Sequence, residues 1–275
     1  MHVALLRAMP GFLEKTDETK VTLMNESAKS LPQHGTTHLE TLGGTPSSRF
    51  ALVVEVILFI GIAIVLKFLV NQLTLRFSGP ISLVMVLVIL TFYLRTRGLK
   101  WSDMGLRALP GVKAKLLVIP QSFLVALVFL AFVGPVMYGA EVFGWEALTE
   151  TPVGIQERFN NVRGNLPMFL LWLVIVWTTT AFGEEMFFRG YLITRLQSAF
   201  ADLKFGNALA VIAPALLFGF AHMSYQGVRG LVMTGLIGLA FGTMFLVFKR
   251  NLWPLVLWHG LTNTMSFTVL YLGLE

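Results

Sequence analysis

Seven long runs of apolar residues follow one another between Ala51 and Leu272, and they constrain the fold more than any other feature of the chain. A membrane-spanning helix needs about 20 such residues. The runs cover approximately 51–74, 79–95, 115–138, 167–190, 206–223, 228–248 and 252–272. They are continuous rather than alternating, and they are too long for the strands of a membrane β-barrel. The sequence therefore predicts an all-α fold, a polytopic membrane helical bundle with about seven transmembrane helices.

The composition supports a membrane protein over the other broad classes. Hydrophobic residues make up 55% of the chain and charged residues only 13%, whereas soluble domains are about 45–50% apolar and about 25% charged. The absence of cysteine excludes disulfide scaffolds, thiolate metal sites and cysteine nucleophiles. The net charge of +6 is typical of the basic loops of membrane proteins. We therefore expect the lipid bilayer as a partner and no nucleic acid.

The chain divides into two parts of different composition. Residues 14–48 combine charged residues with Ser, Thr, Gly and Pro, and they contain no sustained apolar period. Such a segment cannot bury enough apolar surface to fold alone. We therefore predict a mostly disordered polar N-terminal tail at 1–48, followed by a multi-pass membrane domain at 49–275.

Loop charges predict the orientation of the bundle. The connection that follows the second run is basic, and it contains Arg95, Arg97, Lys100, Arg107, Lys113 and Lys115. Basic loops remain in the cytoplasm. The long connection at 139–165 carries four glutamates and suits the opposite side. The protein is therefore predicted to be an integral, multi-pass membrane protein with a cytoplasmic N-terminus.

Charged residues inside the apolar runs cost at least about 2.5 kcal/mol each and need an explanation. Glu55 and Lys67 lie toward the two ends of the first run, and we interpret both as side chains that snorkel to the membrane surface. In the fourth run, Glu185 and Arg189 are four residues apart with the acid first, the favourable order for a helical ion pair. The adjacent Glu184 has no local partner, which makes it a candidate functional residue.

Two histidines and an amide lie in later runs. His222 ends the fifth run, and His259 and Asn263 are four residues apart on one face of the seventh. Glu184 and His222 are equidistant from position 203, so an antiparallel hairpin of the fourth and fifth runs places them opposite each other. His259, however, comes early in its own run. A shared site therefore requires that the 190–208 stretch project beyond the bilayer, or that a helix be broken.

These groups permit hydrolysis of a peptide bond without a covalent intermediate. Glu184 can take a proton from a water molecule held by His222 and then pass it to the leaving amine. Asn263 and His259 offer N–H donors to the tetrahedral oxyanion. This chemistry needs no cofactor. The alternative is a zinc site with Glu184, His222 and His259 as ligands and Glu185 as the base.

Three short motifs resemble those of a known family. EEMFFR at 184–189, FGFAH at 218–222 and HGLTN at 259–263 are similar to the EExxxR, FxxxH and HxxxN motifs of the CPBP family, the CAAX proteases and bacteriocin-processing proteins, also called the Abi family. The motif-bearing core is then 165–270. The segment WSDMGLR at 101–107 also resembles a short stretch common before that core. The resemblance implies an all-helical intramembrane endopeptidase that cleaves a peptide bond near the membrane surface.

The resemblance also implies a role for each motif residue. Glu184 becomes the acid/base with His222 as its partner, while His259 and Asn263 stabilise the oxyanion. Glu185 and Arg189 become structural support. The substrate is expected to be a peptide or a membrane-anchored protein. Two alternatives are a non-catalytic immunity or scaffold protein of the same fold, and a proton-coupled transporter that uses Glu184 as its proton site.

Overall fold

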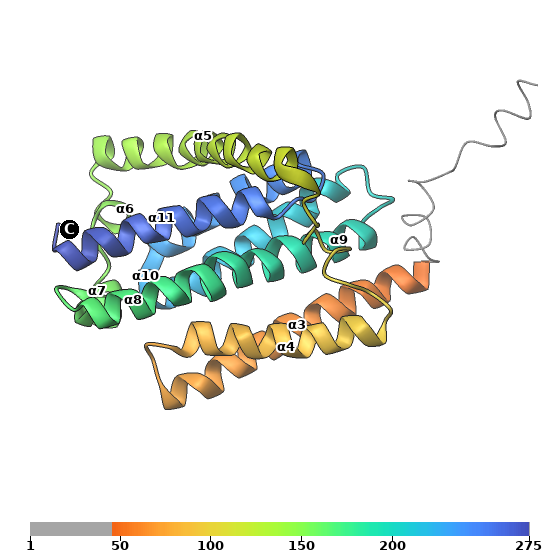
Figure 1. Cartoon of the computed structure of the whole chain (residues 1–275), viewed down its shortest axis with the longest axis horizontal. Helices are drawn as coiled ribbons and strands as arrows, with labels where there is room; N and C mark the ends of the chain where they lie inside the picture. The colour runs from red at the N-terminus through yellow and green to blue at the C-terminus, as the bar shows by residue number, and fades with distance from the viewer. Residues whose placement is uncertain (1–45, 275) are drawn as a thin grey trace, which may run out of the picture. The chain divides into compact units, whose positions relative to one another are not determined.

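The computed structural model describes residues 46–274, which form helices and connecting turns with no strand among them (Figure 1). The long elements are α3 (Pro46–Leu73), α4 (Ser78–Thr96), α5 (Gly111–Phe143), α8 (Leu166–Ile175) continuing through the π-helix η2 (Val176–Ile193) into α9 (Thr194–Ala199), α10 (Gly206–Val247) and α11 (Trp253–Leu272). Between α5 and α8 lie the short elements α6 (Glu146–Thr149), α7 (Val153–Phe159) and η1 (Asn160–Val162). The all-α prediction is confirmed. The tail predicted at 1–48 lies outside the described residues except for 46–48, which begin α3.

Helix α10 is an antiparallel pair of helices that reverses at a single residue. Gly227 has φ 57° and ψ −150°, outside the helical region and in backbone geometry that favours glycine. The two halves pack closely, because a Cβ atom added to Gly238 would lie 2.7 Å from the Cα atom of Ala215. Residues 206–226 and 228–247 therefore correspond to the fifth and sixth predicted runs.

Five described helical segments are long and apolar enough to cross a membrane, namely 48–73, 78–96, 111–143, 166–199 and 206–247. The last of these contributes two crossings because of the reversal at Gly227. Helix α11 is the seventh long segment and carries more polar residues, including His259 and Asn263. The bundle is that of an integral membrane protein.

The fourth and fifth predicted runs form the expected hairpin. The rings of Phe188 and Phe218, which are equidistant from position 203, are 4.8 Å apart. Gly190 lies beside the start of α11, since a Cβ atom added there would be 3.3 Å from Cδ1 of Leu252. Helix α9 continues from this level away from α11 (Figure 1). The 190–208 stretch therefore projects past the start of α11, as a site shared by Glu184 and His259 requires.

The segment at 101–107 supports the start of α11. Gly105 has φ 97°, and a Cβ atom there would lie 2.7 Å from the ring of Phe245. Its carbonyl oxygen accepts a hydrogen bond of 3.2 Å from the backbone N–H of Leu252. A side chain at Gly105 would separate the two segments. This turn therefore fixes the end of the helix that carries His259.

The interpretation of Glu55 as a snorkelling side chain is wrong. Its carboxylate is buried and accepts hydrogen bonds of 2.7 and 2.6 Å from Arg195 of α9. The hydroxyl groups of Tyr93 and Tyr191 donate to the same carboxylate at 2.8 and 2.9 Å. The charge is paired inside the protein because α9, 140 residues further along, packs against α3. Lys67 donates to Ser78 at the start of α4.

Candidate active site

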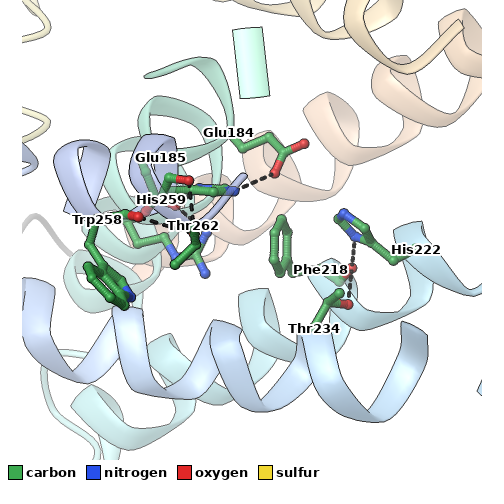
Figure 2. A network of polar contacts seen from close by, with 9 residues as sticks. Glu184, Glu185, Phe218, His222, Thr234, Trp258, His259 and Thr262 are labelled. Carbon is green, nitrogen blue, oxygen red and sulfur yellow. Dashed lines mark hydrogen bonds and ion pairs between the residues drawn. The ribbon is translucent and has the colours of Figure 1, made fainter. Parts of the chain in front are cut away.

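The carboxylate of Glu185 is the buried centre of the site. It lies in η2, whose wide π-type turns are frequent at functional positions. Its side chain is 0% exposed, and its Oε1 atom is 3.0 Å from Nη1 of Arg189. The same oxygen lies 2.8 Å from Nδ1 of His259 (Figure 2). The predicted ion pair is therefore present, and the same carboxylate also holds a histidine that follows 74 residues later.

The contact with Glu185 fixes the orientation of the His259 ring. A carboxylate accepts, so Nδ1 of His259 donates its proton to Glu185 and Nε2 is directed away from it. Nε2 lies 3.9 Å from Oε2 of Glu184, which is too long for a hydrogen bond. The two atoms face each other without a direct bond. Glu185 thus fixes the imidazole of His259, and the Nε2 atom of that ring faces Glu184.

Glu184 differs from its neighbour in both exposure and bonding. Its side chain is 17% exposed, against 0% for Glu185. Within residues 46–274, Oε2 is unpaired in both glutamates, but Oε1 of Glu185 bonds Arg189 and His259, whereas Glu184 makes neither of these hydrogen bonds. This agrees with the expectation that Glu184 lacks a local partner. A carboxylate with a free oxygen beside an imidazole nitrogen can accept a proton from water.

His222 packs on Phe218 rather than on Glu184 (Figure 2). Its Nδ1 atom donates to the carbonyl oxygen of Phe218 at 2.8 Å, and its ring packs on the Phe218 ring at 4.5 Å. With the proton on Nδ1, the neutral ring keeps a lone pair on Nε2. No hydrogen bond joins His222 to Glu184 in the described part of the chain. The hairpin pairs the levels of the two residues, as the 4.8 Å contact of Phe188 with Phe218 shows, but the two side chains do not meet.

Asn263 lies one helical turn after His259 on α11 and is half-buried. Its side-chain amide makes no hydrogen bond with any other described residue. The amide therefore retains both N–H donors. An amide can donate to a reacting oxygen only if its N–H groups are not already bonded within the protein.

The zinc alternative requires three ligands around one point. Across residues 46–274, no group of three or more His, Asp or Glu side chains is placed to hold a metal ion. Glu184 and His259 are neighbours, whereas His222 is bonded to the Phe218 carbonyl and, within those residues, forms no hydrogen bond or ion pair with either of them. The predicted ligand set therefore does not converge in this geometry.

One further charged residue reaches the site from a connection and was not predicted. Arg158 of α7 packs over the ring of Tyr225, with 4.7 Å from its Cζ atom to the ring centroid. Tyr225 in turn packs against His222 at 5.8 Å between ring centroids. No motif in the sequence marks Arg158, because α7 belongs to none of the apolar runs. Its presence extends the site beyond the three motifs.

A family model described as "Type II CAAX prenyl endopeptidase Rce1-like" matches residues 166–265. The matched stretch includes all three motifs and agrees with the predicted core at 165–270. Neither the curated proteins nor the solved structures include a match to this chain. The resemblance to the CAAX proteases is thereby confirmed, and the match supports a membrane protease of the CAAX type.

Proposed function

We propose that this chain, Rce1-like over residues 166–265, is an intramembrane endopeptidase in which Glu184 activates the attacking water. One observation carries the proposal: the partly exposed carboxylate of Glu184 faces an imidazole that a second, fully buried carboxylate holds in place. An unpaired buried carboxylate oxygen costs stability, and within residues 46–274 Oε2 is unpaired in both glutamates. Glu184 differs from Glu185 because it is partly exposed and makes no hydrogen bond to Arg189 or His259.

In the proposed reaction, a water molecule lies against Glu184 and His259 and attacks the carbonyl carbon of the substrate. The water oxygen forms the new bond to carbon while its proton passes to Glu184. The tetrahedral intermediate then collapses. Glu184 returns the proton to the leaving nitrogen as the C–N bond breaks, which yields a carboxylic acid and an amine. No covalent enzyme intermediate forms.

The negative charge on the intermediate needs hydrogen-bond donors. Asn263 supplies an amide N–H from the turn that follows His259, and His259 supplies its Nε2–H when the ring carries both protons. His222 has its Nε2 lone pair available to orient a water molecule or a substrate N–H group. These four residues are the proposed catalytic set, and Glu185 and Arg189 are its structural support.

The proposal requires no metal or other cofactor, since a carboxylate base generates the nucleophile. The partners are the lipid bilayer and a peptide or membrane-anchored protein substrate. We place the N-terminus in the cytoplasm, because the basic connection between α4 and α5 then lies on the cytoplasmic side.

The test is a comparison of the membrane-associated peptides of cells that express the wild type, Glu184→Gln or Glu146→Gln. Glu146 lies in α6, outside the motifs, and is exposed. We expect one or more cleavage fragments in the wild type and in Glu146→Gln that disappear in Glu184→Gln at equal protein level. Identical fragments in all three samples would refute the proposal and would favour the non-catalytic scaffold.

A further inference from the structure

Arg158 is held beside the proposed catalytic groups by aromatic rings. Its Cζ atom lies 4.7 Å from the centroid of the Tyr225 ring and 5.7 Å from that of Phe159. Cation–π packing of this kind fixes a guanidinium without using its hydrogen-bond donors. Tyr225 contacts His222, so the guanidinium lies next to the outer edge of the site.

Among residues 46–274, no acidic residue neutralises Arg158 by direct contact. The ion pairs among the described residues join other partners, and none includes Arg158. Its Nε atom is buried and has no hydrogen-bond acceptor there. A buried donor without an acceptor costs about 1–3 kcal/mol. An acceptor brought by a bound molecule would remove that cost.

Two more cations gather around Arg158. The Nε atom of Arg76 donates to the backbone oxygen of Arg158 at 3.1 Å. Lys67 of α3 lies close enough for the charge of Arg158 to act on it. The end of the α3–α4 hairpin and the neighbouring α7 therefore carry three cationic residues, and a positive region of this kind attracts an anion.

The anion would lie beside the proposed catalytic groups. Arg158 packs on Tyr225 and Tyr225 packs on His222, so one aromatic ring separates the guanidinium from a proposed catalytic residue. Burial lowers the pKa of Arg158, while the negative charge of Glu184 acts in the opposite direction. The ion pairs of the described residues do not join these two side chains.

We propose that Arg158 binds a carboxylate of the peptide substrate and so determines which peptides are cleaved. The planar guanidinium matches a carboxylate with two parallel hydrogen bonds. Lys67 and Arg76 raise the local positive potential. The carboxylate is either the free C-terminus of the substrate or an acidic side chain close to the scissile bond. This inference rests on the proposed peptidase function and names the substrate class of that site.

The test uses full-length protein in phosphatidylcholine vesicles and a synthetic peptide library. The library is prepared with free and with amidated C-termini, and with Asp or Asn at each position around the cleaved bond. Cleavage is measured by mass spectrometry for the wild type, Arg158→Gln, Arg158→Lys and Arg163→Gln. Arg163 is the control, since it lies in the same connection and donates weakly to the carbonyl oxygen of Gly273 at 3.4 Å, away from the site.

We expect the wild type to prefer the carboxylate peptide over its neutral counterpart by about 10- to 100-fold in kcat/KM, the value of a charge-assisted hydrogen bond. Arg158→Gln should lose that preference through a higher KM, with cleavage of the neutral peptide unchanged. Arg158→Lys should keep part of it, and Arg163→Gln all of it. If amidation of the C-terminus lowers kcat/KM of the wild type, the bound carboxylate is the C-terminus of the peptide. If replacement of Asp by Asn lowers it, the bound carboxylate is a side chain.

Three results would overturn the inference: no preference in the wild type, an undiminished preference in Arg158→Gln, or an equal loss for both peptides in that variant. A different result would show that the proposed peptidase function is wrong. In that case the wild type and Glu184→Gln would cleave the library equally, or neither would cleave it. Peptide binding by fluorescence anisotropy in the Glu184→Gln background gives a second readout. There, Arg158→Gln should weaken binding of the carboxylate peptide alone.

Discussion

The Nδ1 atom of His259 lies 2.8 Å from Oε1 of Glu185, an oxygen that is also 3.0 Å from Nη1 of Arg189. One buried carboxylate therefore balances a buried guanidinium and orients an imidazole. The neighbouring Glu184 makes neither contact, and its side chain is 17% exposed. The two adjacent glutamates thus differ in environment, and substitutions can test the separate roles that we propose for them.

Glu184→Gln preserves shape but removes the base, so we expect cleavage to vanish while the folded protein and its melting temperature persist. Glu185→Gln leaves Arg189 with a neutral partner in a buried position. Breaking a buried pair costs about 3–5 kcal/mol, so this variant should lose folded yield as well as activity. Cleavage per folded molecule and thermal unfolding are measured on the same purified sample. Near-normal cleavage by Glu184→Gln would show that another group is the base.

Asn263→Ala should lower kcat by roughly 10²–10³ with little change in KM, because the lost donor acts mainly in the transition state. Asn263→Asp places a carboxylate where a donor is needed. Protonation removes its repulsion of the oxyanion, so its activity relative to wild type should rise toward acid pH. A pH profile of kcat for the three proteins checks both effects. If Asn263→Ala only lowers the melting temperature and kcat per folded molecule is preserved, Asn263 serves helix packing.

Purified protein should contain less than one metal ion per chain and should keep its activity after treatment with a chelator. The physical reason is that Glu184 generates the nucleophile without a Lewis acid. Elemental analysis and a cleavage assay with and without chelator are the measurements. Stoichiometric zinc in the wild type that is lost from His259→Ala would establish the zinc alternative instead.

The Glu55–Arg195 pair predicts a strong effect on stability far from the motifs. Glu55→Gln leaves Arg195 in a buried position without its counter-ion, which costs about 3–5 kcal/mol. The double variant Glu55→Leu, Arg195→Met removes both charges and should unfold at a higher temperature than Glu55→Gln. Thermal unfolding in detergent compares the two. Equal melting temperatures for the wild type and Glu55→Gln would contradict a structural role for the pair.

The sequence predicts best the features that depend on local spacing. The Glu185–Arg189 pair follows from a separation of four residues on one helix, and the hairpin centred on 203 follows from two long apolar runs joined by a polar turn. Each needs only neighbours along the chain or a symmetric fold of it. The number and order of the long helical segments along the described chain are predictable for the same reason.

The sequence does not predict contacts that depend on tertiary packing. Glu55 bonds Arg195 only because α9 packs on α3. The sequence of the first apolar run alone therefore predicts that the Glu55 side chain lies at the membrane surface, which is wrong. The hairpin sets the level of Glu184 and His222 but not the rotation of the helices, and His222 contacts Phe218 rather than Glu184 (Figure 2). Arg158 comes from a short helix whose position no periodicity indicates.

The reversal at Gly227 follows His222 by only five residues. At a rise of 1.5 Å per residue this corresponds to about 8 Å along the helix axis, and an extended peptide covers about the same distance in two or three residues. In the proposed peptidase, a substrate strand that enters at this end of the bundle reaches His222 without passing through a whole span. The position of the helix reversal then sets the smallest number of residues between the cleaved bond and the point of entry.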